Sequence, residues 1–155
     1  MMNVLLEIWE YVVVFLLGAV PWIEVAAVIP LSIVAGLNPV LVGLFAFLGN
    51  LSTVYLLVVF FEKYRQWRSR KKGEEQPESK RQARAVNIWN KYGLPGLSLL
   101  GPLLIGSHIA AFIGLVLGAR KHQMLFWMTI SLLIWTVIIT IISYYGIDWL
   151  SGLRK

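Results

Sequence analysis

Hydrophobic residues lie in four long blocks separated by short polar stretches. The blocks run over residues 11–37, 40–61, 93–119 and 124–147. Each block, at a rise of about 1.5 Å per residue in a helix, is long enough to cross a hydrocarbon core of roughly 30 Å. The pattern predicts an all-α polytopic membrane protein.

The second and fourth blocks predict plain transmembrane helices, whereas the first and third are interrupted. Pro21, Glu24 and Pro30 interrupt the first block, and Pro95 and Pro102 interrupt the third. A proline inside a helix removes a backbone donor and clashes with the preceding turn. Irregular backbone is tolerated in a membrane only where it is buried in protein or lines a watery cavity. We therefore predict that each interrupted block forms a broken or re-entrant helical hairpin.

The two halves of the chain repeat one plan, in which an interrupted block and a glycine turn precede an intact span. Gly36 and Gly118 close the interrupted blocks, and aligning these glycines brings Pro21 and Pro102 within one residue of register. This predicts an inverted repeat of two units, each a hairpin followed by a transmembrane helix. The predicted organisation is a single membrane domain, 1–155, with a first repeat at 1–61, a basic loop at 62–92 and a second repeat at 93–150.

Two topologies fit this plan. If both hairpins are re-entrant, the halves are inverted repeats with both termini outside the cell. If all four blocks cross, the halves are parallel repeats with both termini inside. Either topology leaves twelve Lys and Arg residues inside, so the positive-inside rule does not distinguish them.

Composition and charge agree with a membrane protein. The chain is 58% hydrophobic and 14% charged, against roughly 45–50% and about 25% in soluble domains. Although the net charge is +6, ten of the fourteen Lys and Arg residues lie in 62–92. Such clustering between hydrophobic blocks predicts a cytoplasmic loop at a prokaryotic inner membrane and argues against nucleic acid as a partner. Cysteine is absent, which excludes thiolate chemistry and cysteine metal clusters.

Glu24 is the acidic residue that lies inside a hydrophobic block. A charge at mid-membrane costs at least roughly 2.5–3.5 kcal/mol on insertion scales. The carboxyl must therefore be protonated, or face a cation or the positive end of a half-helix. A role in binding a proton, a sodium ion or a substrate is one interpretation, with Pro21 and Pro30 shaping the break. A protonated carboxyl that hydrogen-bonds to backbone at the break is the other.

Ser107 and His108 lie at a comparable depth in the second half, after Gly106. Their polar groups and the open backbone of a glycine predict a ligand or proton site, although a neutral histidine packed between helices is an equally common arrangement. Asn50 lies in the second block and could point toward Glu24. We predict one substrate and ion site where the two hairpin turns meet.

Enzymatic roles find no support in the residues present. The sequence has no Ser/His/Asp set, no paired buried carboxylates, no Walker-type loop and no histidine cluster. We therefore predict no catalysis, no cofactor and no metal site. The basic residues Arg68, Arg70, Lys71 and Lys72 are predicted to bind anionic lipid headgroups, at roughly 1 kcal/mol per nearby cation.

Several stretches resemble the putative small multidrug export protein family. They are Pro21-Trp-Ile-Glu24 with the following residues to Pro30, Leu48-Gly-Asn50, Lys91 to Gly96, Leu100 to His108, and Trp127 to Trp135. The family is similar to the wider DedA/VTT group, whose members resemble inverted-repeat transporters with paired re-entrant hairpins. The resemblance thus implies the inverted topology and a transporter of small molecules or lipid-like substrates.

Two positions depart from that resemblance. Val25 follows Glu24 where the family often has arginine, and Gly106-Ser107-His108 replaces a DedA-type arginine in the second hairpin. A phosphate-bearing lipid substrate that needs arginine is therefore less strongly implied. The leading prediction is an ion-coupled secondary transporter, and the alternative is a non-transporting lipid-interacting or assembly factor. Because two short halves leave little room for a cavity, we predict a homo-oligomer that contacts membrane lipids.

Overall fold

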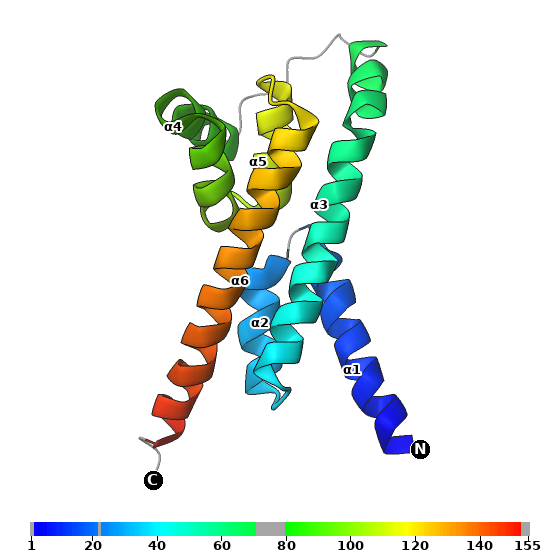
Figure 1. The fold of residues 1–155 in the computed structure, drawn as a ribbon, viewed down its shortest axis with the longest axis vertical. Helices are drawn as coiled ribbons and strands as arrows, with labels where there is room; N and C mark the ends of the chain where they lie inside the picture. The colour runs from blue at the N-terminus through cyan, green and yellow to red at the C-terminus, as the bar shows by residue number, and fades with distance from the viewer. Residues whose placement is uncertain (1, 22, 71–79, 153–155) are drawn as a thin grey trace. The chain divides into compact units, whose positions relative to one another are not determined.

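The chain folds into α-helices. The computed structural model describes the backbone of residues 2–21, 23–70 and 80–152, and the side chains of 7–21, 23–61, 88–89, 91–146 and 149. This described backbone forms six helices and no strand (Figure 1). They are α1 (Met2–Ala19), α2 (Glu24–Val34), α3 (Pro39–Arg70), α4 (Lys80–Leu104), α5 (Ser107–Val116) and α6 (Lys121–Gly152). The prediction of an all-helical chain is confirmed.

Contacts between residues divide the chain into two compact units. The first unit comprises Met1–Thr53 with Leu132–Lys155, and the second comprises Val54–Ser131. The first unit thus contains α1, α2, the beginning of α3 and the end of α6. The second unit contains α4, α5, the end of α3 and the beginning of α6.

In the first unit, the chain reverses after α1, so that α2 runs back beside it (Figure 1). The buried core joins Val14 of α1, Ile29 of α2, and Val42 and Ala46 of α3, with Ile139 of α6 packed against it. These apolar side chains come from four helices. Helix α2 is too short to be stable alone, so packing against the other three helices stabilises it.

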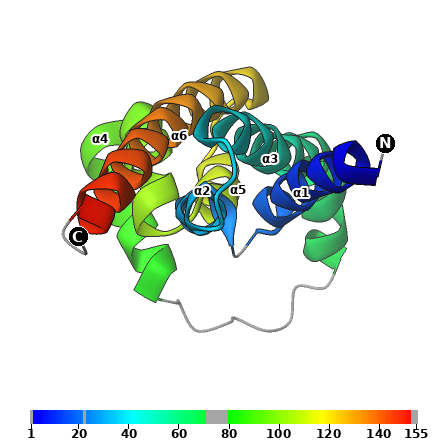
Figure 2. The ribbon, with the colours of Figure 1, turned by 90° about the horizontal axis from the view of Figure 1, so that it is seen from below.

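Two glycines allow α1 and α3 to approach closely in the first unit. A Cβ built on Gly18 would lie 2.7 Å from the Ala46 carbonyl oxygen, and one built on Gly49 would overlap the Phe15 carbonyl oxygen. Figure 2 shows the two helices side by side. Small residues at helix contacts are the usual means of close packing in membranes, where apolar burial alone does not drive association.

In the second unit, α4 and α5 form another hairpin. Its buried core includes Leu97 of α4, Ile105 of the turn, and Ala110 of α5. Helix α4 is broken at Gly93, whose φ of 65° and ψ of −159° lie in a region that glycine alone adopts readily. Pro95 therefore falls in the first turn after the break, where its missing N–H costs no hydrogen bond.

The helices α2 and α5 end in the same backbone turn. Gly36 N–H donates to Ile33 O over 3.0 Å, and Gly118 N–H donates to Leu115 O over 3.2 Å. The donors on either side of each glycine repeat in the same way, and both glycines have positive φ, 92° and 102°. Each bond recurs 82 positions later, from 36 to 118, so the glycine register predicted from the sequence is present in the local backbone. The inverted arrangement of the halves stays a prediction.

A capping asparagine begins α3. The Asn38 Oδ1 accepts from Val40 N–H at 3.0 Å and from Leu41 N–H at 3.3 Å, which satisfies two otherwise unpaired donors. Pro39 occupies the first helical position, where proline is favoured. The Asn38 N–H also donates to the Tyr11 hydroxyl oxygen at 3.2 Å, which ties this turn to α1.

The predicted loop over 62–92 is largely helical, which corrects the sequence-based expectation. Helix α3 continues to Arg70 and α4 begins at Lys80, while residues 71–79 lie outside the described part of the chain. The reason is that Glu, Lys, Arg, Gln and Ala are strong helix formers. A polar helix needs no hydrophobic period to remain helical when it continues a membrane span.

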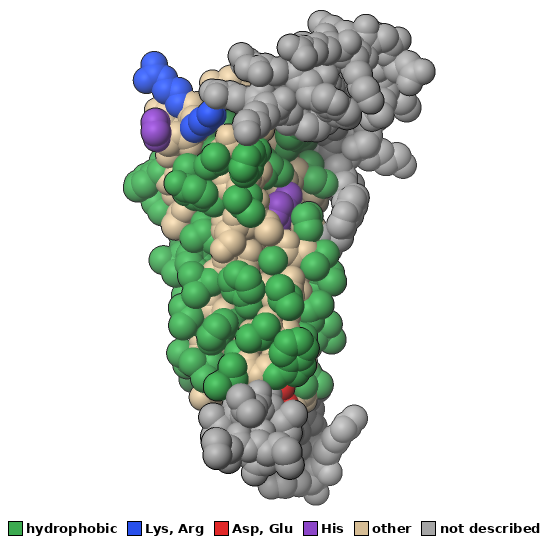
Figure 3. All heavy atoms as spheres, turned by 90° about the vertical axis from the view of Figure 1, so that its right-hand side faces the viewer, with side chains coloured by type: hydrophobic (Ala, Val, Ile, Leu, Met, Phe, Trp, Pro, Cys, Tyr) green, Lys and Arg blue, Asp and Glu red, His purple; other side chains and the backbone are tan. Residues whose placement is uncertain are grey.

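Two of the described helical segments are long and apolar enough to cross a membrane, Pro39–Phe61 and Lys121–Gly146. Only 33% and 22% of their most apolar stretches are buried, whereas a core helix of a soluble protein is mostly buried. Hydrophobic side chains accordingly dominate the described surface in Figure 3. Exposed apolar surface of this kind is typical of contact with lipid.

Substitution of either turn glycine by alanine is expected to destabilise the protein equally. Both Gly36 and Gly118 have positive φ and no neighbouring atom within 4 Å of a built Cβ, so the backbone conformation alone sets the cost. Gly36→Ala and Gly118→Ala should each lose about 1–2 kcal/mol. Chemical unfolding in detergent measures both, and clearly unequal losses would contradict a shared turn.

Candidate functional site

Glu24 begins helix α2 in an unusual backbone conformation. Its φ is 49°, and it is the one non-glycine residue with positive φ in the described part of the chain. Its side chain is 7% exposed. The turn before it is closed by Val20 O, which accepts from Ile23 N–H at 3.1 Å and from Glu24 N–H at 3.4 Å. The sequence thus places a carboxyl group at the buried start of a helix, inside a hydrophobic block.

This conformation is costly for a glutamate. A left-handed backbone costs an L-residue about 1–2 kcal/mol because its Cβ approaches the following carbonyl oxygen. The position 82 residues later is Gly106, which also has a positive φ, 99°. Because glycine has no Cβ, it adopts a positive φ without this steric cost. The first half therefore carries a carboxyl group where the second half carries an unstrained glycine. Backbone strain of this kind concentrates at functional positions.

The start of α2 places partial positive charge near the carboxyl group of Glu24. Glu24 is the first residue of α2, at the end of the helix where backbone N–H groups carry partial positive charge. A carboxylate there is stabilised by about 0.3–1 kcal/mol at exposed positions and by up to about 2 kcal/mol where partly buried. The sequence analysis gave the positive end of a half-helix as one way to stabilise a charged Glu24 in the membrane, and Glu24 lies at such an end.

The other predicted residues of the first half differ in burial. Pro21 lies in the turn and is exposed, while Pro30 lies inside α2 and is half-buried. Asn50 lies in α3 and is fully buried. The backbone carbonyl oxygen of Asn50 accepts a hydrogen bond from Thr53 Oγ1 at 3.0 Å. All of these residues belong to the first unit.

The predicted residues of the second half lie together at the start of α5. Gly106 forms the turn, and Ser107 and His108 are the first two helical residues. Both side chains are buried, at 0% and 6% exposure, and Ser107 Oγ lies 3.2 Å from His108 Nδ1. The structure therefore brings a hydroxyl and an imidazole into hydrogen-bond contact inside the second unit.

The predicted headgroup residues lie at the edge of the described structure. Arg68 and Arg70 are part of the α3 backbone, but their side chains are outside the described part. Lys71 and Lys72 lie outside the described residues altogether. Their contact with lipid headgroups stays a prediction.

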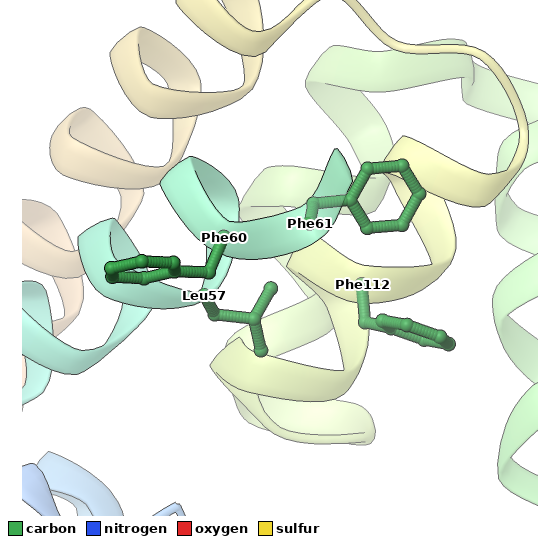
Figure 4. A pocket seen from close by; sticks show the side chains of 4 residues that line it. All are labelled: Leu57, Phe60, Phe61 and Phe112. Carbon is green, nitrogen blue, oxygen red and sulfur yellow. The ribbon is translucent and has the colours of Figure 1, made fainter. Parts of the chain in front are cut away.

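An apolar groove lies in the second unit, close to the start of that basic stretch along the chain. Leu57, Phe60 and Phe61 of α3 and Phe112 of α5 line it, and its volume is about 410 Å³ (Figure 4). Phe61 and Phe112 meet edge to face with ring centroids 5.9 Å apart. The four described side chains that line the groove are apolar, so they provide apolar contact.

Side chains that commonly coordinate metal ions are not clustered in the described part of the chain. Among the side chains described by the structure, no three His, Asp or Glu residues are grouped so that they could hold a metal ion. The polar groups of the two hairpin turns suit binding of a proton, a small ion or a hydrogen-bonding substrate.

The model of one protein family matches residues 24–138, and its description is "Putative small multi-drug export protein". The chain belongs to this family. The match begins at Glu24 and includes Asn50, Gly106, Ser107 and His108, so every candidate residue beyond Pro21 lies within the family region. The resemblance predicted from the sequence is confirmed for this family, while the relation to the DedA/VTT group stays a prediction.

Membership of the small multidrug export family agrees with a membrane transporter rather than an enzyme. The family description names export, and the apolar spans of α3 and α6 agree with a place in the membrane. No curated protein and no solved structure matches the chain.

Proposed function

We propose that this chain is a secondary transporter, coupled to a proton or a sodium ion. It moves a small amphipathic or lipid-like molecule through a site formed by two re-entrant hairpins. The observation that carries the proposal is Glu24, a buried carboxyl group held in a strained backbone conformation at a helix start. Stability alone would favour glycine there, as at Gly106.

The chemistry of Glu24 supports ion coupling. A carboxyl group in an apolar membrane segment is costly when charged and unpaired, so its charge must be balanced by an ion, a proton or a dipole. The N-terminal end of α2 supplies a partial balance. Binding and release of a cation would then change the free energy of the hairpin, which is the property that an ion-coupled transporter needs.

The second hairpin supports a substrate-binding role. Ser107 and His108 provide a hydroxyl and an imidazole in mutual contact at the start of a helix. Together they offer both donor and acceptor groups to a polar part of a substrate. The shared turn geometry after α2 and α5 supports a repeat that would relate this hairpin to the first, and the inverted orientation of the two halves is part of the proposal.

The place of the protein in the cell is part of the proposal. We propose an inner membrane protein with both termini outside and the basic segment 62–92 in the cytoplasm, in accordance with the positive-inside rule. A homo-oligomer would complete the surface around two short halves, and the many exposed hydrophobic side chains of α3 and α6 support further contacts with lipid or a second copy.

A flux assay tests the proposed function. Purified protein in liposomes is supplied with ethidium as an amphipathic cation, or with a fluorescent phospholipid, under a pH gradient or a sodium gradient. We expect the wild-type protein to move one of these probes in response to one gradient. Glu24→Gln keeps the side-chain shape but removes the charge, and should lower gradient-driven flux at least about tenfold.

Two results would count against the proposal, the first against transport and the second against coupling through Glu24. One is the absence of gradient-dependent flux for both probes, and the other is normal coupled flux in Glu24→Gln. A matched comparison replaces Arg68, Arg70, Lys71 and Lys72 together by glutamine. If that variant loses activity in cells while Glu24→Gln does not, the protein is a lipid-interacting factor instead.

A further inference from the structure

The part of α4 before Gly93 is a helix distinct from the part after it. The backbone of Gly93 interrupts α4, and the two parts run in different directions (Figure 1). We call the first part, residues 80–92, the basic helix. Because the break separates it from the apolar hairpin of α4 and α5, the basic helix can take an orientation in the membrane that the hairpin does not share.

The basic helix concentrates positive charge along one side. It contains four Lys and Arg residues and no Asp or Glu. Three of the cations, Lys80, Arg84 and Lys91, are separated by four and by seven residues. In a helix this spacing places their backbone positions along one line. Asn87 falls on the same line, so the line is polar throughout.

The apolar residues of the basic helix attach it to the hairpin. Ile88 and Trp89 are half-buried and pack against the core of the second unit, which includes Leu97 and Ala110. A helix that has bulky apolar residues on one side and Lys and Arg on another is typical of helices that lie in the interface between lipid and water. The basic helix has this composition and is anchored to the protein.

The end of the basic helix has the residues that mark a membrane interface. Lys91 and Tyr92 are both exposed, and Lys91 Nζ lies 5.1 Å from the centre of the Tyr92 ring. The Cβ of Tyr92 would overlap a Cβ built on Gly96, so this tyrosine is packed against the start of the hairpin. Tyr and Trp are enriched at the level of lipid headgroups, and lysine extends its charge toward them.

The charge of this surface determines the chemistry of its partner. A line of cations without a neighbouring acid along the helix attracts anions, and the anions available at a membrane interface are lipid headgroups. We propose that the basic helix lies at the headgroup level and that Lys80, Arg84 and Lys91 bind anionic phospholipids. This surface is separate from Glu24 and from Arg68–Lys72, and it does not depend on transport.

Lipid-dependent thermal unfolding tests this surface. Phosphatidylglycerol, or phosphatidylcholine as the zwitterionic lipid, is added to the purified protein in a neutral detergent. A lipid that binds the folded protein raises Tm, so the rise of Tm with lipid concentration gives an apparent Kd. We expect the Kd for phosphatidylglycerol to be at least about tenfold lower than that for phosphatidylcholine. Equal values of Kd in the wild-type protein would overturn the proposal.

Two double variants remove the same amount of charge at different places. Arg84→Gln with Lys91→Gln should raise the Kd for phosphatidylglycerol at least about tenfold. Arg120→Gln with Lys121→Gln, at the start of α6, is the matched control and should change this Kd by less than about threefold, because charges away from the binding surface are screened by salt. Similar changes in both variants would show a general attraction to net positive charge and contradict a binding line on the basic helix.

A conservative variant separates loss of charge from loss of structure. Arg84→Lys with Lys91→Arg keeps both charges and should keep the preference for phosphatidylglycerol. If it loses the preference as the glutamine variant does, charge is not the cause and the proposal fails. Inorganic phosphate added in place of lipid distinguishes a free anion from a headgroup. A rise of Tm with phosphate as large as that with phosphatidylglycerol would show an anion site rather than a lipid surface.

Discussion

Replacing Glu24 with glycine is expected to abolish gradient-driven transport and still leave a more stable protein than Glu24→Ala. Both substitutions remove the carboxyl group, so both should lose ion coupling. They differ in the backbone, because the φ of 49° strains alanine as it strains glutamate but does not strain glycine. The glycine variant should therefore be more stable than the alanine variant by about 1–2 kcal/mol.

Chemical unfolding in detergent measures this difference, and liposome flux measures the loss of coupling. The second hairpin provides a comparison, because Gly106→Ala introduces strain at a φ of 99° and a ψ of 144°, a conformation that is less accessible to alanine than the left-handed helical region, and should lose at least as much free energy. Equal stabilities of Glu24→Gly and Glu24→Ala would show that the turn is not strained. Coupled flux in Glu24→Gly would remove the carboxyl group from the mechanism.

A single added methyl group at Gly49 is expected to disrupt the packing of α1 on α3. The Cβ of alanine would overlap the Phe15 carbonyl oxygen and lie 3.1 Å from the Ala19 backbone nitrogen. Backbone atoms cannot rotate aside as the end of a side chain can, so the helices must separate. Gly49→Ala should cost about 1–3 kcal/mol, as overpacking of a close contact does.

Gly146→Ala is the control for this substitution. Gly146 lies inside α6, and a Cβ built on it has no neighbour within 4 Å. Alanine is the better helix former by about 1 kcal/mol, so this variant should be neutral or slightly stabilised. Unfolding of both variants in detergent compares them, and a Gly49→Ala variant as stable as Gly146→Ala would contradict the close crossing.

The broad architecture could be predicted from the sequence because it depends on hydrophobic blocks and on proline and glycine. The intact blocks became the spans of α3 and α6, and the block around Pro21 is broken between α1 and α2. Gly36 and Gly118 could be paired because a left-handed turn after a helix favours glycine whatever surrounds it. Each of these features follows from local chemistry.

Features that depend on neighbours or on competing propensities could not be predicted. The helical extension of α3 to Arg70 was missed, because a polar sequence without hydrophobic period resembles a loop although its residues favour helix. The conformation of Glu24 follows from closure of the hairpin, and no sequence pattern marks a glutamate for positive φ. The contact of Thr136 and Thr140 with Gly43 depends on how α6 packs against α3, and no local pattern of residues predicts it.

The difference between Glu24 and Gly106 makes the two halves chemically unequal although their turns are alike. Under the proposed function, an ion acts on the carboxyl group of the first hairpin, whereas the corresponding position of the second hairpin is a glycine that is followed by Ser107 and His108. Opposite motions of the two halves would therefore have different energies at a given ion concentration. The proposed transporter should therefore respond unequally to an ion gradient and to the same gradient reversed.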